Sequence, residues 1–147
     1  MTVDKLLHDF LTKGVKFYPA TNSLKFHSND EADENYLWID PPWRIVKGNR
    51  VIASSFTCPW HENFKTKEEY QHAFTEWCQA MNYLNELEVK GHLVRQPVND
   101  LVIEWSDGTI LEVFQKRYED DSWYITDKSN KKYYLALPDK IQITDMK

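Results

Sequence analysis

Glycine is scarce in this chain, with only four in 147 residues. All four stand where turns or helix ends are expected: Gly14, Gly48, Gly91 and Gly108. Loops that wrap backbone N–H groups around a phosphate, and the strained turn that presents the serine of α/β-hydrolases, depend on glycine at fixed spacings. The sequence therefore excludes a phosphate-cradling loop, a dinucleotide-binding fingerprint and a nucleophile elbow.

Cysteine and long apolar runs are also lacking. The two cysteines, Cys58 and Cys78, can form at most one disulfide, whereas small secreted domains usually carry several. No stretch of about 18 apolar residues exists to span a bilayer, and the N-terminus has an amphipathic pattern instead of the apolar run of an export signal. We therefore expect a cytoplasmic protein with reduced thiols that neither enters a membrane nor is exported.

Positive charge is in the minority. Lys and Arg number 18 against 23 Asp and Glu, which gives a net charge of −5 and a pI near 5.5. Because proteins bind a phosphate backbone through clustered Lys and Arg that release counterions, this balance disfavours direct binding of nucleic acid.

The negative charge is concentrated in two segments. The first has no Lys or Arg between Asn29 and Asp40 and contains Asp30, Glu31, Asp33, Glu34 and Asp40. The second lies in an expected loop between two strand-like runs and consists of Glu119, Asp120 and Asp121. Two interpretations are open: hydrated loops that keep the protein in solution, or a surface that meets a basic partner.

Two segments have the apolar spacing of helices. After Thr2, a candidate N-cap, one stripe contains Val3, Leu6, Leu7, Phe10 and Leu11. A longer helix is predicted over residues 66–88, because Thr66 and Glu69 have the capping-box spacing. Its stripe consists of Tyr70, Phe74, Trp77, Met81 and Leu84. We expect both stripes to pack in the core.

The rest of the chain has the pattern of short strands joined by polar turns. Strands are predicted at residues 15–18, 24–27, 36–39, 43–45, 51–56, 92–96, 101–106, 109–115, 123–126, 133–137 and 141–144. The sequence thus predicts an α+β fold, in which an antiparallel twisted β-sheet of about six or more strands packs against one long amphipathic helix, with a short N-terminal helix nearby. We expect a single domain over residues 1–147.

One hairpin is predicted residue by residue. Asp107-Gly108 between two strand-like runs favours a two-residue type I′ turn, in which both central residues have positive φ. Ser106 then lies opposite Thr109, and Glu104 and Glu112 point to opposite faces, which excludes an acid pair acting on one substrate. Both faces carry apolar residues in this register, so we expect the second face to be partly covered.

Four side chains have types that bind zinc: Cys58, His61, His72 and Cys78. Their spacing argues against a site, because six residues rotate His72 and Cys78 to nearly opposite faces of a helix. A neighbouring imidazole can draw a thiol toward the thiolate, but no orienting carboxylate or oxyanion-hole motif accompanies Cys58 and His61. We predict no catalytic residues, no metal ligands and no cofactor.

The segment from Asp40 to Arg44 places a tryptophan and a guanidinium directly after Pro41-Pro42. Two interpretations are open. The segment is either an edge that contacts a ligand, or a structural corner in which Trp43 fills the core and Arg44 pairs with Asp40.

The order of elements over residues 36–143 adds one further indication. It consists of Tyr36-Leu37-Trp38-Ile39-Asp40-Pro41-Pro42-Trp43-Arg44-Ile45, Ser54-Ser55, a helix, Asp100-Leu101-Val102-Ile103-Glu104-Trp105-Ser106-Asp107-Gly108, and Trp123. This order resembles small bacterial immunity proteins of contact-dependent and polymorphic toxin systems. The resemblance implies a cytoplasmic, non-enzymatic protein that binds one cognate toxin tightly, often a nuclease with a basic cleft.

The predicted function is therefore that of a binding protein that masks a toxin through acidic surface. The candidate contact residues are Asp30, Glu31, Asp33, Glu34, Glu119, Asp120 and Asp121. Two alternatives remain open. One is a small enzyme or ligand-binding protein with a pocket between sheet and helix, lined by Trp105, Tyr124 or Trp77; the other is a structural adaptor that uses an exposed sheet edge.

Overall fold

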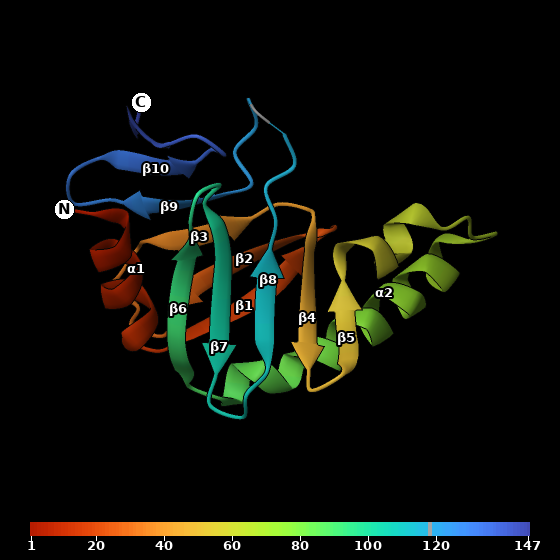
Figure 1. Cartoon of the computed structure of the whole chain (residues 1–147). Helices are drawn as coiled ribbons and strands as arrows, with labels where there is room; N and C mark the ends of the chain where they lie inside the picture. Colours follow the sequence, from red (N-terminus) through yellow and green to blue (C-terminus); the bar gives the residue numbers. More distant parts are fainter. Residues whose placement is uncertain (118) are drawn as a thin grey trace.

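Two antiparallel β-sheets form the framework of the α+β fold, so the prediction of a single sheet is wrong (Figure 1). The computed structural model describes residues 1–117 and 119–147, without the side chain of His61. The six-stranded sheet has the order β1-β2-β3-β9-β10-β11, and the five-stranded sheet has the order β5-β4-β8-β7-β6. The chain therefore passes from the first sheet to the second after β3 and returns after β8.

The element boundaries agree closely with the sequence pattern. The six-stranded sheet contains β1 (Val15–Ala20), β2 (Ser23–Ser28), β3 (Tyr36–Ile39), β9 (Trp123–Asp127), β10 (Lys132–Ala136) and β11 (Ile141–Asp145). The five-stranded sheet contains β4 (Trp43–Lys47), β5 (Arg50–Ser54), β6 (Val89–Arg95), β7 (Asp100–Trp105) and β8 (Ile110–Val113). The helices are α1 (Val3–Thr12), α2 (Lys67–Asn82) and three short 3₁₀ segments, η1 (Ser55–Thr57), η2 (Pro59–His61) and η3 (Tyr83–Glu86).

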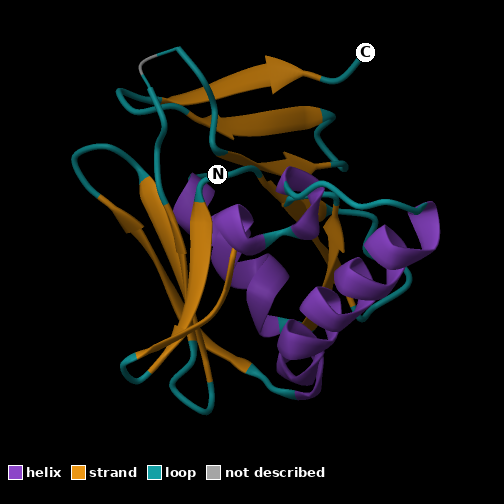
Figure 2. Cartoon of the chain, turned by 90° about the vertical axis from the view of Figure 1, so that its right-hand side faces the viewer, coloured by secondary structure: helices purple, strands orange, loops and turns teal. Residues whose placement is uncertain are grey.

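The core lies where the two sheets face each other, with their strands running crosswise (Figure 1). Trp105 of the five-stranded sheet is 1% exposed and packs against Phe17 and Phe26 of the other sheet, at ring-centroid distances of 5.9 and 6.3 Å. The helices lie between the sheets on the inner side, and none of those that the structure describes covers the outer face of the five-stranded sheet (Figure 2).

The two predicted helices are present, but the longer one ends at Asn82 and is followed by η3 instead of continuing to residue 88. The Oγ1 atoms of Thr2 and Thr66 accept the expected N-terminal hydrogen bonds, from the N–H groups of Lys5 and Glu69. In α1 the predicted stripe is buried except at Val3, which is partly buried. In the longer stripe, Met81 and Leu84 are 0% exposed and Trp77 is 9% exposed, whereas Tyr70 and Phe74 are only partly buried. The first turns of α2 extend beyond both sheets, which leaves their aromatic residues half-exposed (Figure 1).

The double proline forms the corner at which the chain leaves the six-stranded sheet. Trp43, directly after it, is 1% exposed and donates its indole N–H to the carbonyl of Asn22 at 2.8 Å, so the interpretation of Trp43 as a core residue is confirmed. The predicted pairing of Arg44 with Asp40 is wrong. Arg44 instead pairs with Glu112 on the neighbouring strand β8, at 2.9 Å.

The hairpin between β7 and β8 differs from the predicted register by one residue. Trp105, not Ser106, lies opposite Thr109 and donates its N–H to the Thr109 carbonyl. Only Gly108 in the turn has positive φ, at 88°, while the Asp107 carboxylate accepts the Thr109 N–H at 2.9 Å and stabilises a three-residue loop. A type I′ turn would need positive φ at Asp107 as well.

This shift changes which side chains face the core. The inner face now carries the buried apolar residues of the hairpin, whereas Val102 and Ile110 are partly exposed on the outer face; the buried residues are Leu101, Ile103, Trp105, Leu111 and Val113. Glu104 and Glu112 therefore share the outer face, contrary to the prediction, and each pairs with its own cation, Lys90 and Arg44. The expected cover over this second face is also absent among the described residues (Figure 2).

Strand β1 continues two residues further than predicted, through Pro19. Its outward-facing backbone groups are those of Val15, Phe17 and Pro19, because the intervening residues pair with β2. Proline at an outward position removes an N–H that has no ladder partner, so it does not end the strand. The outward N–H of Phe17 donates to Oδ1 of Asn85 at 2.8 Å, and the outward carbonyl of Phe17 accepts from Nδ2 of Asn85 at 3.0 Å.

Candidate functional site

The outer face of the six-stranded sheet carries an unusual concentration of aromatic side chains. The register places Tyr18, Trp38 and Tyr124 in one cross-strand row, and Tyr36 and Tyr133 in the next. Their neighbours in each strand, such as Leu37 and Ile125, are fully buried on the inner face. We call Tyr18, Tyr36, Trp38, Tyr124 and Tyr133 the aromatic face. All five are partly or largely exposed.

Three of these rings form a connected series. Tyr124 lies edge-to-face against both Tyr36 and Tyr133, with ring centroids 5.8 Å apart in each pair. The hydroxyl groups of Tyr36 and Tyr124 are 3.4 Å apart. Burial, followed by the proximity of Tyr36, raises the pKa of Tyr124, so this hydroxyl remains protonated and able to donate a hydrogen bond. Edge-to-face contacts of this kind hold aromatic rings in fixed orientations.

Trp38 is held in place by a polar anchor. Its indole N–H donates to Oδ1 of Asp40 at 2.8 Å, and the same oxygen accepts a hydrogen bond from Ser23 at 2.8 Å. Asp40 is thus the residue that orients the tryptophan, while Arg44 pairs with Glu112. The tryptophan ring is oriented before any partner arrives.

Two lysines lie against the ring of Tyr36. The Nζ atoms of Lys25 and Lys128 are 4.5 and 5.6 Å from its centroid. Cations in this position are attracted by the ring quadrupole. Lys25 lies within the aromatic face, between Tyr18 and Trp38, whereas Lys128 lies at its end beside the first acidic loop.

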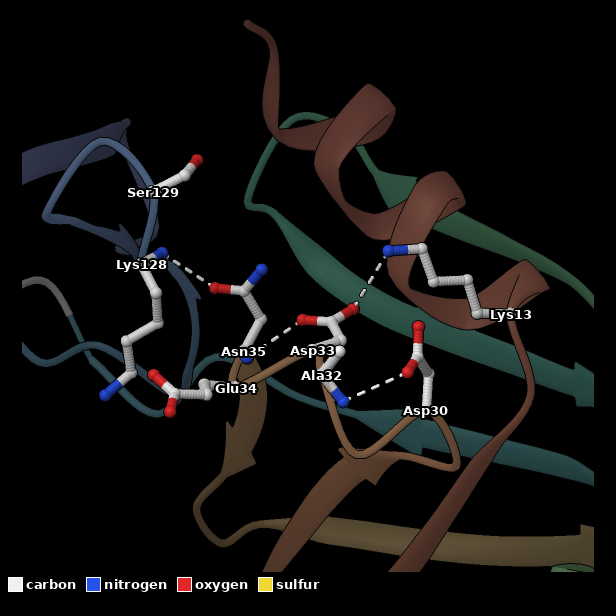
Figure 3. A pocket seen from close by; sticks show the side chains of 8 residues that line it. All are labelled: Lys13, Asp30, Ala32, Asp33, Glu34, Asn35, Lys128 and Ser129. Carbon is white, nitrogen blue, oxygen red and sulfur yellow. Dashed lines mark hydrogen bonds and ion pairs between the residues drawn. The ribbon is translucent and has the colours of Figure 1, made fainter.

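The first predicted acidic segment lies in the loop before β3 (Figure 3). This loop leads directly into Tyr36, so it borders one end of the aromatic face. Asp30, Glu31 and Glu34 are exposed. Asp33 has a structural role, because its side chain is only 7% exposed, pairs with Lys13 at 3.2 Å and accepts the N–H of Asn35 at 3.0 Å. Together with Lys128, this loop borders an open hollow of about 340 Å³.

The second acidic segment lies at the other end, before β9. Glu119 is exposed and Asp120 pairs with Arg117 at 3.0 Å. Burial raises the pKa of Asp121, and the negative charge of Asp40 raises it further. Asp121 and Asp40 therefore both contribute negative charge at this end, where Lys116 partly offsets it.

The structure does not bring the two acidic segments together. They lie at opposite ends of β9, Trp123–Asp127, and a strand of this length separates them by roughly 16 Å. The aromatic face occupies the surface between them. The predicted contact residues are therefore the rim of a larger surface, whose centre the sequence interpretation missed.

The thiols are placed unfavourably for chemistry. Cys58 is 1% exposed and donates to the carbonyl of Thr21 at 3.4 Å, and burial raises the pKa of its thiol. Burial raises the pKa of Cys78 to about 11. The predicted partner of Cys58, the side chain of His61, lies outside the described residues. Across the described part of the chain, no three His, Cys, Asp or Glu side chains converge as metal ligands, and His72 pairs instead with Glu76 at 3.1 Å.

The residues named for a pocket between sheet and helix are not neighbours in one cavity. Trp105 is enclosed in the core, whereas Tyr124 belongs to the outer aromatic face. Trp77 packs between Phe74 and Trp43, at centroid distances of 5.7 and 5.8 Å. The structure therefore does not bring together the three side chains on which that alternative depended.

Comparisons of the chain with protein-family models, with curated proteins and with solved structures give no match. Among the helices that the structure describes, none combines the length and apolar character needed to cross a bilayer.

Proposed function

We propose that this chain is a non-enzymatic binding protein whose protein partner docks on the aromatic face. The observation that carries the proposal is the fixed, partly exposed Trp38, bound to Asp40 at 2.8 Å and surrounded by tyrosines. Tryptophan and tyrosine are enriched among the residues that dominate binding energy at protein interfaces, and such residues lie at the centre of a polar rim. Rings that are already oriented lose little conformational entropy on binding.

The charges at the rim indicate the chemistry of the partner. Asp30, Glu31 and Glu34 lie at one end, and Glu119 and the Asp40–Asp121 pair lie at the other. A partner with Lys or Arg at both ends of its contact surface would complement this arrangement. In keeping with the resemblance to immunity proteins, we propose that the partner is a toxin domain with a basic cleft, which the chain masks.

The first experiment is co-expression in a bacterial host with the proteins encoded beside this chain, each tested as a toxin domain. We expect one of them to arrest growth and the wild-type chain to relieve the arrest. Trp38→Ala should weaken the purified complex by about 30-fold, the loss expected for an interface residue worth about 2 kcal/mol. Leu93→Ala is the matched control, because Leu93 is 54% exposed on the outer face of the other sheet.

Two further measurements separate the centre of the surface from its rim. Glu31→Lys with Glu34→Lys should slow association and flatten its dependence on salt, while leaving dissociation nearly unchanged. Because Asp121 has a raised pKa, acidification should remove its charge earlier than that of an ordinary Asp, so affinity should fall with pH and Asp121→Asn should reduce this dependence. If Trp38→Ala binds as tightly as Leu93→Ala, the docking surface is wrong.

A further inference from the structure

The edge strands of the two sheets differ in whether other parts of the structure cover them or bind their outward backbone groups. On β1, Asn85 binds the outward N–H and C=O of Phe17, and Pro19 has no N–H to offer. At the edges of the five-stranded sheet, α1 packs against β6 and α2 packs against β5. No such protection is present on β11 within the described residues. Unprotected edges are sites at which another strand can add to a sheet.

The backbone of β11 presents a regular set of unpaired groups. Leu137 donates to the Lys140 carbonyl and Met146 donates to the Lys131 carbonyl, which fixes the even-numbered residues of β11 as those that pair with β10. The N–H and C=O groups of Ile141, Ile143 and Asp145 consequently point away from the sheet.

The side chain at the middle of this edge is apolar. Ile143 lies in the same row as Tyr134 and Ile125, which are 6% and 0% exposed, so it belongs to the inner face of the sheet. It is nevertheless 52% exposed, because it extends past the end of the core. Natural edge strands usually carry a charge or a proline at such a position.

We propose that β11 pairs antiparallel with β11 of a second copy of this chain, with Ile143 opposite Ile143 of that copy. This register joins all three outward-facing residues in hydrogen-bonded pairs, because Ile141 lies opposite Asp145. It also aligns Asp139 with Lys147 of the second copy.

The neighbouring register, with Ile143 opposite Ile141, is less favourable. It places Asp139 opposite Asp145 of the second copy, and like charges directly opposite each other destabilise a strand pair. The register shifted the other way places Ile143 opposite Asp145, an apolar side chain opposite a carboxylate. Of these three registers, the first is therefore the one that both pairs isoleucine with isoleucine and aligns opposite charges. A second copy is the occupant that supplies both the matching isoleucine and the matching charges.

The geometry of the pair determines how the two copies are oriented. Antiparallel pairing of identical strands places the two-fold axis perpendicular to the sheet. Both outer faces then lie on the same side of a continuous twelve-stranded sheet, the sum of two copies of the six-stranded one. The dimer thus presents two aromatic faces side by side and remains a prediction whether or not those faces bind a partner.

The test is sedimentation velocity of the purified chain across a wide range of concentration. We expect the mass to double as concentration rises. Ile143→Lys should weaken self-association by at least about tenfold, because two lysines meet at the axis. Ile143→Pro should abolish it, since this N–H is outward and its loss leaves the pairing with β10 intact.

Gln142→Lys is the matched control. Gln142 is also exposed, but its side chain is on the opposite face and its backbone pairs with β10. We expect this variant to associate as the wild type does, and thermal unfolding should show that all variants are folded. A wild-type chain that stays monomeric throughout, or an Ile143→Lys variant that dimerises like Gln142→Lys, would overturn the proposal.

Discussion

The hydrogen bonds between Asn85 and strand β1 allow a quantitative prediction. The Oδ1 atom of Asn85 accepts the N–H of Phe17 at 2.8 Å, and its amide nitrogen donates to the carbonyl of the same residue at 3.0 Å. Phe17 is 4% exposed, so neither backbone group has full access to water. Asn85→Ala therefore leaves a donor and an acceptor unpaired.

Each unpaired buried group costs about 1–3 kcal/mol, and partial access to water places Asn85→Ala at about 2–4 kcal/mol in the free energy of unfolding. For a chain of this size, the corresponding fall in Tm is roughly 5–15 °C. Urea denaturation and calorimetry measure both quantities. Asn82→Ala is the control, because Asn82 is exposed at the end of α2.

Asn85→Asp tests the geometry more sharply. The new carboxylate can accept from the Phe17 N–H, but its second oxygen faces the Phe17 carbonyl and repels it. Protonation restores a donor, so the folded state holds the proton more tightly than the unfolded state and the pKa of the new carboxyl is raised on folding. Stability relative to Asn85→Ala should therefore rise as pH falls through that raised pKa. Two results would refute this role of the Asn85 hydrogen bonds. One is equal stability of Asn85→Asp and Asn85→Ala at every pH, and the other is a free energy of unfolding for Asn85→Ala within about 0.5 kcal/mol of wild type.

Two further predictions concern the turn and the thiols. Gly108→Ala should lower the free energy of unfolding by about 1 kcal/mol, because φ at Gly108 is +88° and alanine is strained there. An added Cβ meets no atom within 4 Å, so the backbone strain is the whole effect. Gly91 has no positive φ, so Gly91→Ala should change the free energy of unfolding less. Equal effects of the two substitutions would contradict this explanation of the turn. Cys58 and Cys78 should react slowly with iodoacetamide at pH 8.5 in the native protein, because burial raises the pKa of both thiols, and both should react rapidly after unfolding in guanidinium. Rapid native labelling at Cys58 would contradict the observed burial.

The local elements were predictable from sequence because their signals are local. Thr2 precedes a helix whose apolar residues follow its period, and Thr66 is found at the predicted cap of α2. The strand pattern also located every strand of the structure to within a few residues. Propensity and periodicity do not state which strands are partners.

The division into two sheets depends on that missing information. Strand β3 pairs with β9, so Tyr36 and Tyr124 are neighbours although they are separated by 88 positions in the chain. No turn or cap connects these strands. Strand β4 likewise pairs with the distant strand β8, so the prediction of a single sheet failed at the two pairings that join distant segments.

The aromatic face was hidden for a related reason. Tyr36 and Trp38 alternate with the buried Leu37 and Ile39 along β3, so the two pairs of side chains point to opposite faces of the sheet. This alternation does not reveal whether another element covers the face that carries Tyr36 and Trp38. The acidic residues, in contrast, are clustered along the sequence and can be recognised from it. Their relation to the aromatic face is visible only in three dimensions.

The pairing of β3 with β9 also affects when the aromatic face is completed during synthesis. During synthesis, Tyr36 and Trp38 emerge long before Tyr124 and Tyr133, which complete the surface around them. Domains whose pairings join distant segments fold only after the later segment is available. A ribosome-bound chain that ends before residue 123 would therefore lack part of the proposed docking surface.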